Sequence, residues 1–596
     1  MKQFLHILTG LFICFLVHSC KSDKDFLTEK PETFYTVDNA FSTSAQVDQV
    51  LIGIYSNIRE AWTNPGEQAW MFIFKGNGTD EFDVPSIRRG GTFNNYANIN
   101  PDNASFYDIY SFWYDLISKA NLAIYAANLP QIKWNSDEEK KYALAQARFF
   151  RAFAYRNLGE EFGGVPIVTE VSTTPKYNFT RSTRIETYDF AITEMEAVLN
   201  DLPATTVAGG RLVKGAAQHN LCELYLAKGI ELEATSKTGE AQDAYTKSIQ
   251  YGNDVIDGGV YSLMQDRFGK RASEATISIP VYKGGLYSTA SIVDTVQQTT
   301  NVFWDLFQEG NVNYQEGNKE CIWAAQVDYA AYRTGDGESK LPYSRTYGPV
   351  FRDGSSGNLT GTNEDVGGRG ISQMMPTFYA REEIFSSKWG NDMRNSDAAF
   401  RRRFKSNVVA SSYYRKEVPW SVLYNGSSDN TTNINNRSLC YPISCKIATD
   451  KYTGIPDGEN MSNLFRDEYI IRLPETILLR AEAKQRSGDK AGAASDINLL
   501  RTRAQCSYKV TAGDMDDNFN LILDERAREL IYEECRWNTL LRMGKAIAVE
   551  RIKKYAYWPE AQATLTFNFN LWPIPQKVIE TNKDAVIAQN PDWVNK

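Results

Sequence analysis

Few side chains in this sequence could act as a catalytic base. Of its three histidines, His6 and His18 lie near the amino terminus, so His219 alone remains farther along the chain. Catalytic triads and Cys–His dyads need an imidazole or an equivalent base. His219 stands beside Asn220 in a segment predicted to be helical, which favours a packed or surface role. The sequence also lacks the His-Glu-x-x-His, phosphate-loop Gly-Lys-Ser/Thr, Gly-x-Gly-x-x-Gly and EF-hand patterns, so those reaction classes are set aside.

Paired carboxylates are the one catalytic arrangement that remains open. Asp80, Glu81 and Asp83 cluster in a stretch without clear periodicity. A glycoside hydrolase needs only two carboxyl groups at a suitable separation, which a sequence does not reveal. Acidic triplets are also common on protein surfaces. A surface glycoside hydrolase is therefore kept as an alternative, and a protein without enzymatic activity is favoured.

The cysteines do not form a metal-binding pattern. Of the eight, Cys440 and Cys445 are the closest pair outside the amino-terminal segment. Their spacing does not fit a zinc ribbon or finger, and no histidine accompanies them. Both a disulfide and two free thiols are compatible with this pair. The sequence predicts neither a metal site nor a cofactor.

Aromatic residues are unusually frequent, at 13% of the chain. Flat aromatic rings can cover the apolar faces of sugar rings, while Asn, Asp and Arg can bond the hydroxyl groups. We therefore select aromatic and acidic residues in irregular segments with polar neighbours. Trp323 lies in an apolar, strand-like run and is assigned to the core. The predicted glycan-binding residues are Trp70, Asp80, Tyr96, Trp304, Trp389 and Trp420.

The amino terminus indicates export and a lipid anchor. Lys2 precedes an apolar run from Phe4 to Val17, which is typical of a secretory signal peptide over residues 1–19. Ser19 directly before Cys20 resembles a bacterial lipobox, so Cys20 is the predicted lipid attachment site. An ordinary signal peptide with an incidental cysteine is the alternative. Residues 20–43 are predicted to be a tether on the outer membrane. The net charge of -8 opposes nucleic-acid binding.

Helical periodicity recurs in two parts of the chain. Residues 136–158 begin with Ser136 and Glu139, a capping-box spacing, and continue with apolar residues three and four apart. Helix pairs are predicted at 216–229 with 241–256, and at 475–487 with 493–504, where Pro474 fits the first helical position. Residues 165–171 are predicted to be a short strand or an extended exit. Such pairs bury their apolar faces by stacking, and about four are expected from residues 44–260 and 470–545.

These elements predict a mainly α fold. It is a tetratricopeptide-like helical-repeat solenoid with a large, irregular, loop-rich insertion. The expected parts are a helical region at 44–264, an irregular ligand-binding insertion at 265–470 and a helical part of the same domain at 471–596. Long irregular segments in a compact protein are usually functional, and the aromatic content of 265–470 argues against disorder.

Several motifs occur in an order that resembles the RagB/SusD family of surface lipoproteins. They are Cys20 with Asp25-Phe26-Leu27 and Pro31; Trp113, Tyr114, Ile117 and Asn121; residues 147–152 and 162–166; residues 471–476, 480–483, 488–489 and 496–498; residues 525–530 with Arg536-Trp537; residues 572–575; and residues 589–591. Most of these residues are architectural. We expect Arg148, Glu475, Glu482 and Arg528 to form buried ion pairs or caps between helices.

The resemblance implies a function as well as a fold. It implies a non-enzymatic, lipid-anchored protein of the outer membrane that faces the cell exterior. Such a protein captures oligosaccharide or polysaccharide and delivers it to a TonB-dependent, SusC-like transporter. The alternatives are the glycoside hydrolase considered above and a structural lid or adhesin without sugar specificity. The resemblance does not identify the glycan.

Overall fold

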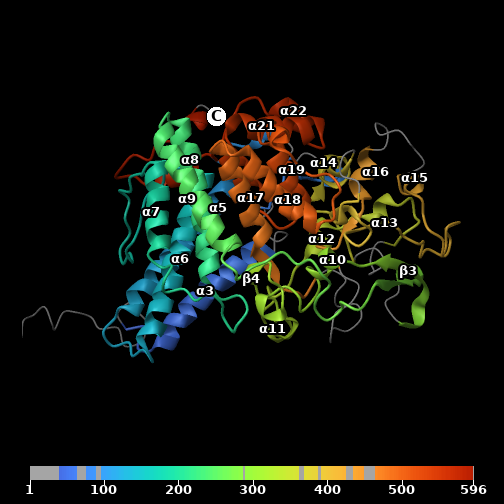
Figure 1. The fold of residues 1–596 in the computed structure, drawn as a ribbon, viewed down its shortest axis with the longest axis horizontal. Coiled ribbons are helices and arrows are strands. Elements are labelled where there is room, and N and C mark those ends of the chain that lie inside the picture. Colours follow the sequence, from blue (N-terminus) through green and yellow to red (C-terminus); the bar gives the residue numbers. More distant parts are fainter. Residues whose placement is uncertain are drawn as a thin grey trace, which may run out of the picture.

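The computed structural model describes residues 39–63, 75–88, 95–285, 289–360, 368–386, 391–424, 434–448 and 463–594. Figure 1 shows long helices gathered on one side of the molecule and shorter elements on the other. The predicted mainly α architecture is confirmed. The signal peptide, Cys20 and most of the predicted tether lie outside the described residues.

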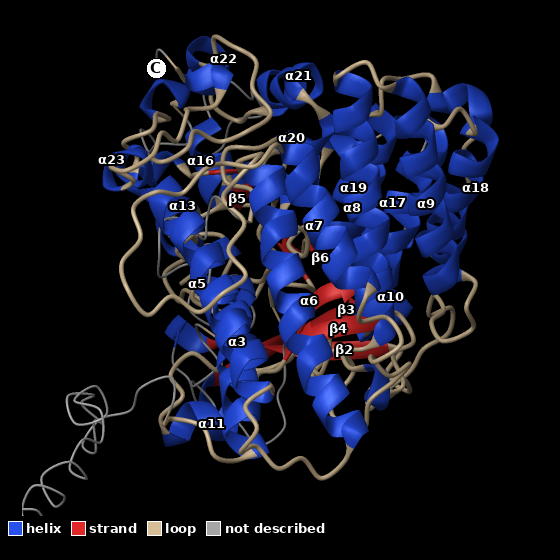
Figure 2. Ribbon diagram, turned by 90° about the vertical axis from the view of Figure 1, so that its left-hand side faces the viewer, coloured by secondary structure: helices blue, strands red, loops and turns tan. Residues whose placement is uncertain are grey.

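A row of long helices forms the helical body of the protein (Figure 2). Successive helices in this row contact one another, and α9 contacts α17 although more than 200 residues separate them in the sequence. The chain therefore leaves the row after α9 and returns to it at α17, as the two periodic parts of the sequence predict. In order, the row is α3 (Ser44–Thr63), α5 (Ala104–Ala127), α6 (Asp137–Glu161), α7 (Arg184–Glu196), α8 (Lys214–Ala234), α9 (Thr238–Ile256), α17 (Leu473–Arg486) and α18 (Lys490–Arg503).

The ends of these helices follow from local chemistry. Ser136 caps α6, because its hydroxyl accepts a hydrogen bond from the backbone N–H of Glu139 at 3.2 Å. A capping box between Thr183 and Glu186 starts α7. Pro474 lies in the first turn of α17, and Gly488, with a φ of 93°, follows its end. Residues 165–169 are extended but form no strand, so the exit was the correct alternative of the two predicted there.

Small residues allow neighbouring helices to approach closely. A Cβ atom added at Gly229 of α8 would lie 2.4 Å from the ring of Tyr245 on α9, and one added at Gly159 of α6 would lie 2.7 Å from the ring of Tyr188 on α7. Both tyrosines are fully buried. The aromatic ring of one helix thus fills the space that the missing side chain of the next helix leaves.

Shorter helices near the carboxyl terminus pack against the long helices of this row. Trp537 on one of these helices, and Trp572 and Trp593 outside them, lie in the same hydrophobic core as the long helices. These helices are α19 (Asn520–Leu530), α20 (Arg536–Met543), α21 (Lys545–Tyr555), α22 (Pro559–Thr564) and α23 (Gln576–Thr581).

The part of the chain between α9 and α17 is built from short elements around a second core. We call residues 265–470 the insertion. Its core includes Phe303, Phe307, Tyr343 and Phe351, all buried. The helices are α10 (Val302–Asp305), α11 (Tyr329–Thr334), α12 (Tyr343–Tyr347), α13 (Phe351–Gly354), α14 (Phe378–Arg381), α15 (Trp420–Leu423) and α16 (Ile434–Leu439).

The strands pair antiparallel in twos. β2 (Thr276–Tyr282) pairs with β3 (Ile292–Thr299), β4 (Cys321–Ala325) with β8 (Glu468–Arg472), β6 (Phe400–Arg401) with β7 (Ile443–Ser444), and β1 (Phe82–Asp83) with β5 (Met375–Pro376). Cys321 lies opposite Arg472, and Ala325 opposite Glu468. The chain therefore passes into and out of most of the insertion at one two-stranded sheet. Trp323 on β4 is buried, as predicted.

Buried ion pairs join the insertion to the helical body. Arg472 at the end of β8 contacts Glu320 of the insertion at 2.7 Å and Glu529 of α19 at 2.9 Å. Arg394 of the insertion contacts Glu525 at 2.8 Å and Glu529 at 3.1 Å. All five side chains are at most 1% exposed. Charges are costly to bury unless they are paired, so each group depends on the others.

The motif residues that we expected to be architectural do form ion pairs. Glu475 pairs with Arg526, Glu482 with Arg542 and Arg486, Arg528 with Glu525, and Arg148 with Glu194. Arg148 is about one-third exposed, whereas the side chains of Glu482 and Arg528 are buried. His219 is buried as well, and its Nδ1 lies 2.8 Å from the hydroxyl of Thr476. Burial lowers the pKa of His219 well below its usual value, so the ring is neutral.

Candidate functional site

Asp80 is a structural residue and not part of an exposed glycan site. Its carboxylate is fully buried between Arg536, at 2.6 Å, and Arg551, at 2.9 Å. Burial raises the pKa of this carboxyl group, but the two guanidinium groups outweigh that effect and lower the pKa to about 2. The prediction of Asp80 as a sugar contact was therefore wrong. The irregular appearance of this stretch reflects a turn folded under the helices.

The neighbouring carboxylates are enclosed too. Glu81 and Asp83 are each 1% exposed. Burial raises the pKa of Asp83 to about 7, although backbone N–H groups bonded to it oppose that change. A glycoside hydrolase needs its two carboxyl groups beside the bound sugar. None of these three acids reaches the surface, so the triplet does not provide such a pair.

Tyr96 and Trp304 are also buried, contrary to the prediction. Tyr96 is 2% exposed, and its hydroxyl donates a hydrogen bond to the carbonyl of Gly78. Trp304 is 3% exposed, with the guanidinium of Arg271 lying 4.7 Å from its ring centroid. Both rings have polar neighbours because they anchor loops to the core. The polar context that marked them in the sequence is thus equally typical of an aromatic ring packed under a loop.

Trp420 is the one predicted aromatic residue that is partly exposed in the described part of the chain. It begins α15, and Tyr424 directly follows the same short helix. The centroids of the two rings lie 5.4 Å apart, and their planes make an angle of 36°. The ring of Phe404 makes an edge contact with Trp420 at a centroid distance of 5.9 Å. We call Trp420 and Tyr424 the α15 aromatic pair. Trp70 and Trp389 lie outside the described residues.

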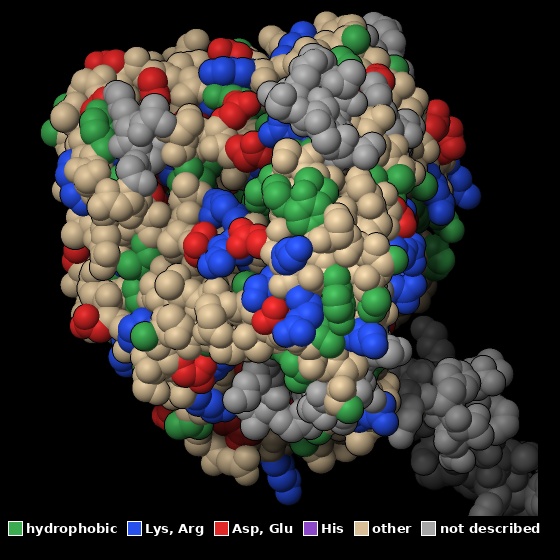
Figure 3. All heavy atoms as spheres, turned by 90° about the vertical axis from the view of Figure 1, so that its right-hand side faces the viewer, with side chains coloured by type: hydrophobic (Ala, Val, Ile, Leu, Met, Phe, Trp, Pro, Cys, Tyr) green, Lys and Arg blue, Asp and Glu red, His purple; other side chains and the backbone are tan. Residues whose placement is uncertain are grey.

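Charged groups stand beside the α15 aromatic pair. The guanidinium of Arg437 lies 5.2 Å from the ring centroid of Tyr424, and it also bonds the carboxylate of Glu382 at 2.8 Å. Figure 3 shows the side of the molecule that carries the insertion, where acidic, basic and apolar side chains are interspersed. Two neighbouring rings with an arginine and a carboxylate at hand can contact both the faces and the hydroxyl groups of a sugar. Neither Tyr424 nor Arg437 was predicted from the sequence.

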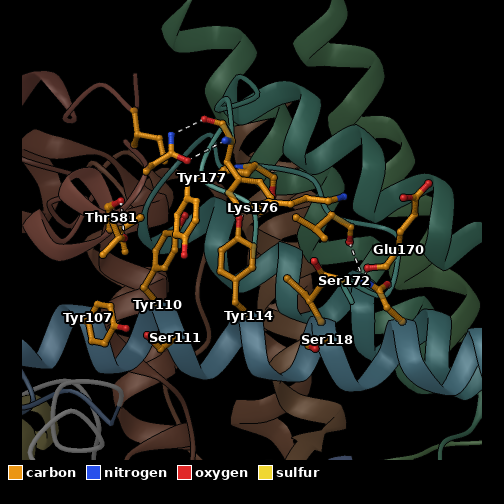
Figure 4. A pocket seen from close by; sticks show the side chains of 18 residues that line it. Tyr107, Tyr110, Ser111, Tyr114, Ser118, Glu170, Ser172, Lys176, Tyr177 and Thr581 are labelled. Atoms are coloured by element: carbon orange, nitrogen blue, oxygen red, sulfur yellow. Dashed lines mark hydrogen bonds between the residues drawn. The ribbon is translucent and has the colours of Figure 1, made fainter. Parts of the chain in front are cut away.

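A separate hollow lies on the helical body. Its volume is about 460 Å³, and its walls are α5, the extended residues 166–179 and residues 578–587. We call it the α5 groove. Tyr107, Tyr110 and Tyr114 rise from α5 toward the segment that carries Lys176 and Tyr177 (Figure 4). Five aromatic side chains line this groove, namely Tyr107, Tyr110, Tyr114, Tyr177 and Phe179, and none of them was among the residues predicted from the sequence.

Hydrogen bonds from α5 fix the wall opposite the helix. The hydroxyl of Tyr114 donates to the carbonyl of Pro166 at 2.6 Å, and the side-chain amide of Asn121 donates to the carbonyl of Val168 at 3.0 Å. These bonds hold an extended segment beside the helix without forming a sheet. The tyrosines repeat three and four residues apart, a spacing that equally indicates a core-facing stripe. The hydroxyl groups of these tyrosines were the one feature of the sequence that could have indicated that an edge of this stripe is exposed to solvent.

Metal and disulfide chemistry are not indicated at either surface. In the described ranges, no three His, Cys, Asp or Glu side chains are arranged to hold a metal ion. Cys440 and Cys445 are both free and buried. Burial raises the pKa of Cys445 to about 12, so this thiol is protonated and unreactive.

Two family models match this chain, one in its amino-terminal part and one in its carboxyl-terminal part. The SusD family model matches residues 293–593, and a model described as "Starch-binding associating with outer membrane" matches residues 25–226. This chain belongs to the SusD family. The SusD-like protein P25 of Formosa agariphila is 22% identical over 584 residues, which cover 95% of each chain. The starch-binding protein SusD of Bacteroides thetaiotaomicron is 32% identical over 164 residues, 25% of this chain and 28% of that protein.

Solved structures share the fold of this SusD family member. A SusD homologue from Bacteroides thetaiotaomicron aligns with a TM-score of 0.65 at 16% identity, covering 94% of this chain and 98% of the other. A laminarin-binding SusD-like protein aligns with a TM-score of 0.60 at 19% identity, covering 93% and 100%. At these identities the likeness concerns the fold. Within the described ranges, no helix has both the length and the apolar character of a membrane-spanning segment.

Proposed function

We propose that this SusD family protein captures oligosaccharide or polysaccharide outside the cell and passes it unchanged to a TonB-dependent, SusC-like transporter. Membership of the SusD family, which the match over residues 293–593 establishes, carries the proposal. Relatives of similar fold or sequence are described as starch-binding and laminarin-binding proteins. The α15 aromatic pair supplies a partly exposed platform of the kind that sugar binding needs.

The α15 aromatic pair can be tested directly. We expect Trp420→Ala combined with Tyr424→Ala to weaken binding of the cognate glycan at least tenfold while the melting temperature changes little, because both rings are partly exposed. Wild-type affinities for such a shallow site should lie between about micromolar and millimolar. Trp134→Ala is a matched control, since Trp134 is a partly buried residue of the helical body. Trp70 and Trp389 remain candidates from the sequence and belong in the same series of variants.

The proposal includes the lipid anchor at Cys20. Stable anchoring requires more than one acyl chain, and a lipoprotein cysteine carries several. We expect Cys20→Ala to release the protein from the membrane fraction, while Ser22→Ala leaves it there. Equal retention of both variants in the membrane fraction would disprove the anchor.

Capture without hydrolysis and delivery to a transporter are separate claims. We expect the purified protein to release no reducing ends from any polysaccharide that it binds. A TonB-dependent barrel should copurify with it from detergent extracts of the native host. Reducing ends that disappear in Trp420→Ala would support the hydrolase alternative. Binding to no glycan in a broad panel would support a structural lid or adhesin.

A further inference from the structure

Three lysines and one arginine lie in or beside the α5 groove without a carboxylate partner in the described part of the chain. Lys176 lines the groove and is exposed. The ammonium groups of Lys577 and Lys583 lie over the rings of Tyr107, at 4.1 Å, and Tyr177, at 4.5 Å. Among the described residues, none of these lysines forms an ion pair, and neither does Arg181.

Arg181 follows the segment 166–179 that forms one wall, does not itself line the groove, and is bonded to uncharged acceptors alone. Its guanidinium donates to the carbonyls of Gly164, at 2.6 Å, and Ala588, at 2.5 Å, and to the side-chain oxygen of Asn590, at 2.7 Å. Burial lowers the pKa of Arg181, which means that its charge is poorly stabilised where it lies.

These unpaired cationic groups differ from the charged groups described elsewhere in the molecule. The chain as a whole carries a net charge of -8, and elsewhere buried arginines meet carboxylates directly. Glu170, the one acidic side chain that lines this hollow, lies toward the far end of Figure 4 from Tyr107. The side chain of Lys176 extends toward the Glu170 side in Figure 4, whereas Lys577 and Lys583 lie over the rings of Tyr107 and Tyr177, so the lysines are distributed along the groove.

The shape and lining of the groove fit a chain of sugar rings. Tyr177 is 39% exposed, so its ring can take a sugar face. The hydroxyls of Ser111 and Ser118 line the floor beside it. At Asn121 and Glu170 the groove continues into a second hollow of about 510 Å³, which reaches Tyr125. From Tyr107 to Tyr125 the helix rises about 27 Å, which is room for several rings in a row.

We propose that the α5 groove is a second glycan site, separate from the α15 aromatic pair, and that it binds an acidic oligosaccharide. The carboxylate or sulfate group of the sugar lies beside Lys176 and Lys583, next to the ring of Tyr177. The rings of the following sugars run along α5 toward Asn121. The proposal goes beyond glycan capture at the insertion and does not require that site to function.

Calorimetric titration of the purified lipoprotein tests this site with defined probes. They are a galacturonate hexamer, its fully methyl-esterified neutral form, a sulfated galactan oligosaccharide and a glutamate hexapeptide. We expect at least one of the two acidic oligosaccharides to bind, and the neutral ester to bind at least tenfold more weakly than the galacturonate if the carboxylate form is the ligand. Added salt should weaken the acidic complex.

Variants then locate the binding. Lys176→Gln combined with Lys583→Gln should weaken binding of the acidic oligosaccharide about tenfold, because two charge-assisted contacts are lost, and Tyr177→Ala should weaken it as well. Lys553→Gln, at an exposed lysine of α21, is the matched control and should bind like the wild type. In the Trp420→Ala, Tyr424→Ala protein the acidic oligosaccharide should still bind.

The outcomes separate this proposal from glycan capture at the insertion. If neither acidic oligosaccharide binds, or if the lysine variants bind like Lys553→Gln, the groove is not an acidic-glycan site, whatever the α15 variants show. If the glutamate hexapeptide binds as tightly as the sugars, the groove recognises anions in general and the proposal is overturned. Loss of binding in the α15 double variant alone would place the acidic oligosaccharide at the insertion instead.

Discussion

In the helical body, buried residues recur at regular intervals along helices of up to 25 residues, whereas the longest described helices of the insertion span six. Each helix of the body contacts its neighbour in the row, so most of its order is local. The insertion draws its order from pairings between distant residues, such as β4 with β8, and from charges shared with α19. The body could therefore keep its shape while the insertion loosens, and four measurements test this difference.

The largest effect should follow from Arg472→Leu, which removes the arginine shared by both regions. Glu320, Glu529 and Glu533 would each lose a buried partner. Breaking a buried ion pair in this way costs about 3–5 kcal/mol of unfolding free energy. Denaturant unfolding measures the cost, and limited proteolysis should cut the insertion before the long helices.

Arg148→Leu is the matched control in the helical body. Arg148 is about one-third exposed, and Arg151 would still pair with Glu194 after the change. We expect a loss within about 1 kcal/mol. Equal losses for Arg148→Leu and Arg472→Leu would show that the two regions do not differ in this respect.

The second-largest effect should come from acid, which weakens the buried ion pairs. The arginines around Asp80 and Glu525 outweigh burial and hold the pKa of each carboxyl at about 2, below the unfolded value of about 4. The stabilisation from a lowered carboxyl pKa is complete above the unfolded pKa and is lost as the pH falls through the folded pKa. Each group should thus contribute roughly 3 kcal/mol that disappears between about pH 4 and pH 2.

Unfolding free energies measured across this pH range provide the check. The slope should be smaller in Asp80→Asn, because that side chain no longer takes up a proton. An unchanged slope in Asp80→Asn would show that other groups cause the acid sensitivity.

Helix contact in the body should be sensitive to a single methyl group. Gly229→Ala places a Cβ atom 2.4 Å from the ring of buried Tyr245, so the two helices must move apart, at a cost of about 1–3 kcal/mol. Gly239→Ala has nothing within 4 Å of the added atom and should be neutral or stabilising by up to about 1 kcal/mol. Thermal unfolding of both variants makes the comparison. A stabilised Gly229→Ala protein would contradict the close contact.

The smallest effect should come from the cap of α7. Thr183→Ala removes the hydroxyl that accepts from the backbone N–H of Glu186, at a cost of about 1 kcal/mol. Thr193→Ala is a suitable control, since the hydroxyl of Thr193 only bonds the carbonyl of Asp189 in the preceding turn. Hydrogen exchange should show faster opening of the first turn of α7 in Thr183→Ala alone.

The helical body was predictable because its signals are local. The cap at Ser136, the proline at the start of α17 and the glycine after its end lie within a few residues of the elements that they define. The motif residues in these helices also carried the family resemblance. Periodicity and capping can be recognised without knowing which distant residue a side chain meets.

The candidate site was less predictable because exposure depends on distant partners. Asp80 pairs with arginines more than 450 residues away, and no local pattern distinguishes it from a solvent-exposed acid. Trp304 and Trp420 have similar polar neighbours in the sequence, yet Trp304 is buried and Trp420 is partly exposed. The α5 groove was missed for the opposite reason, since its tyrosines follow a helical spacing that is usual for a core.

The pairing of β4 with β8 bears on how this protein family could diversify. Neighbouring strands lie about 4.8 Å apart, so residues 326–467 leave and rejoin the body at almost the same place. The free energy of closing a loop rises only slowly with its length. Segments can thus be lengthened, shortened or exchanged between relatives there while the row of helices stays in register. A chimaera that carries another relative's segment between Ala325 and Glu468, and keeps an arginine in place of Arg394 to pair with Glu525 and Glu529, would inherit a new recognition surface on the same scaffold.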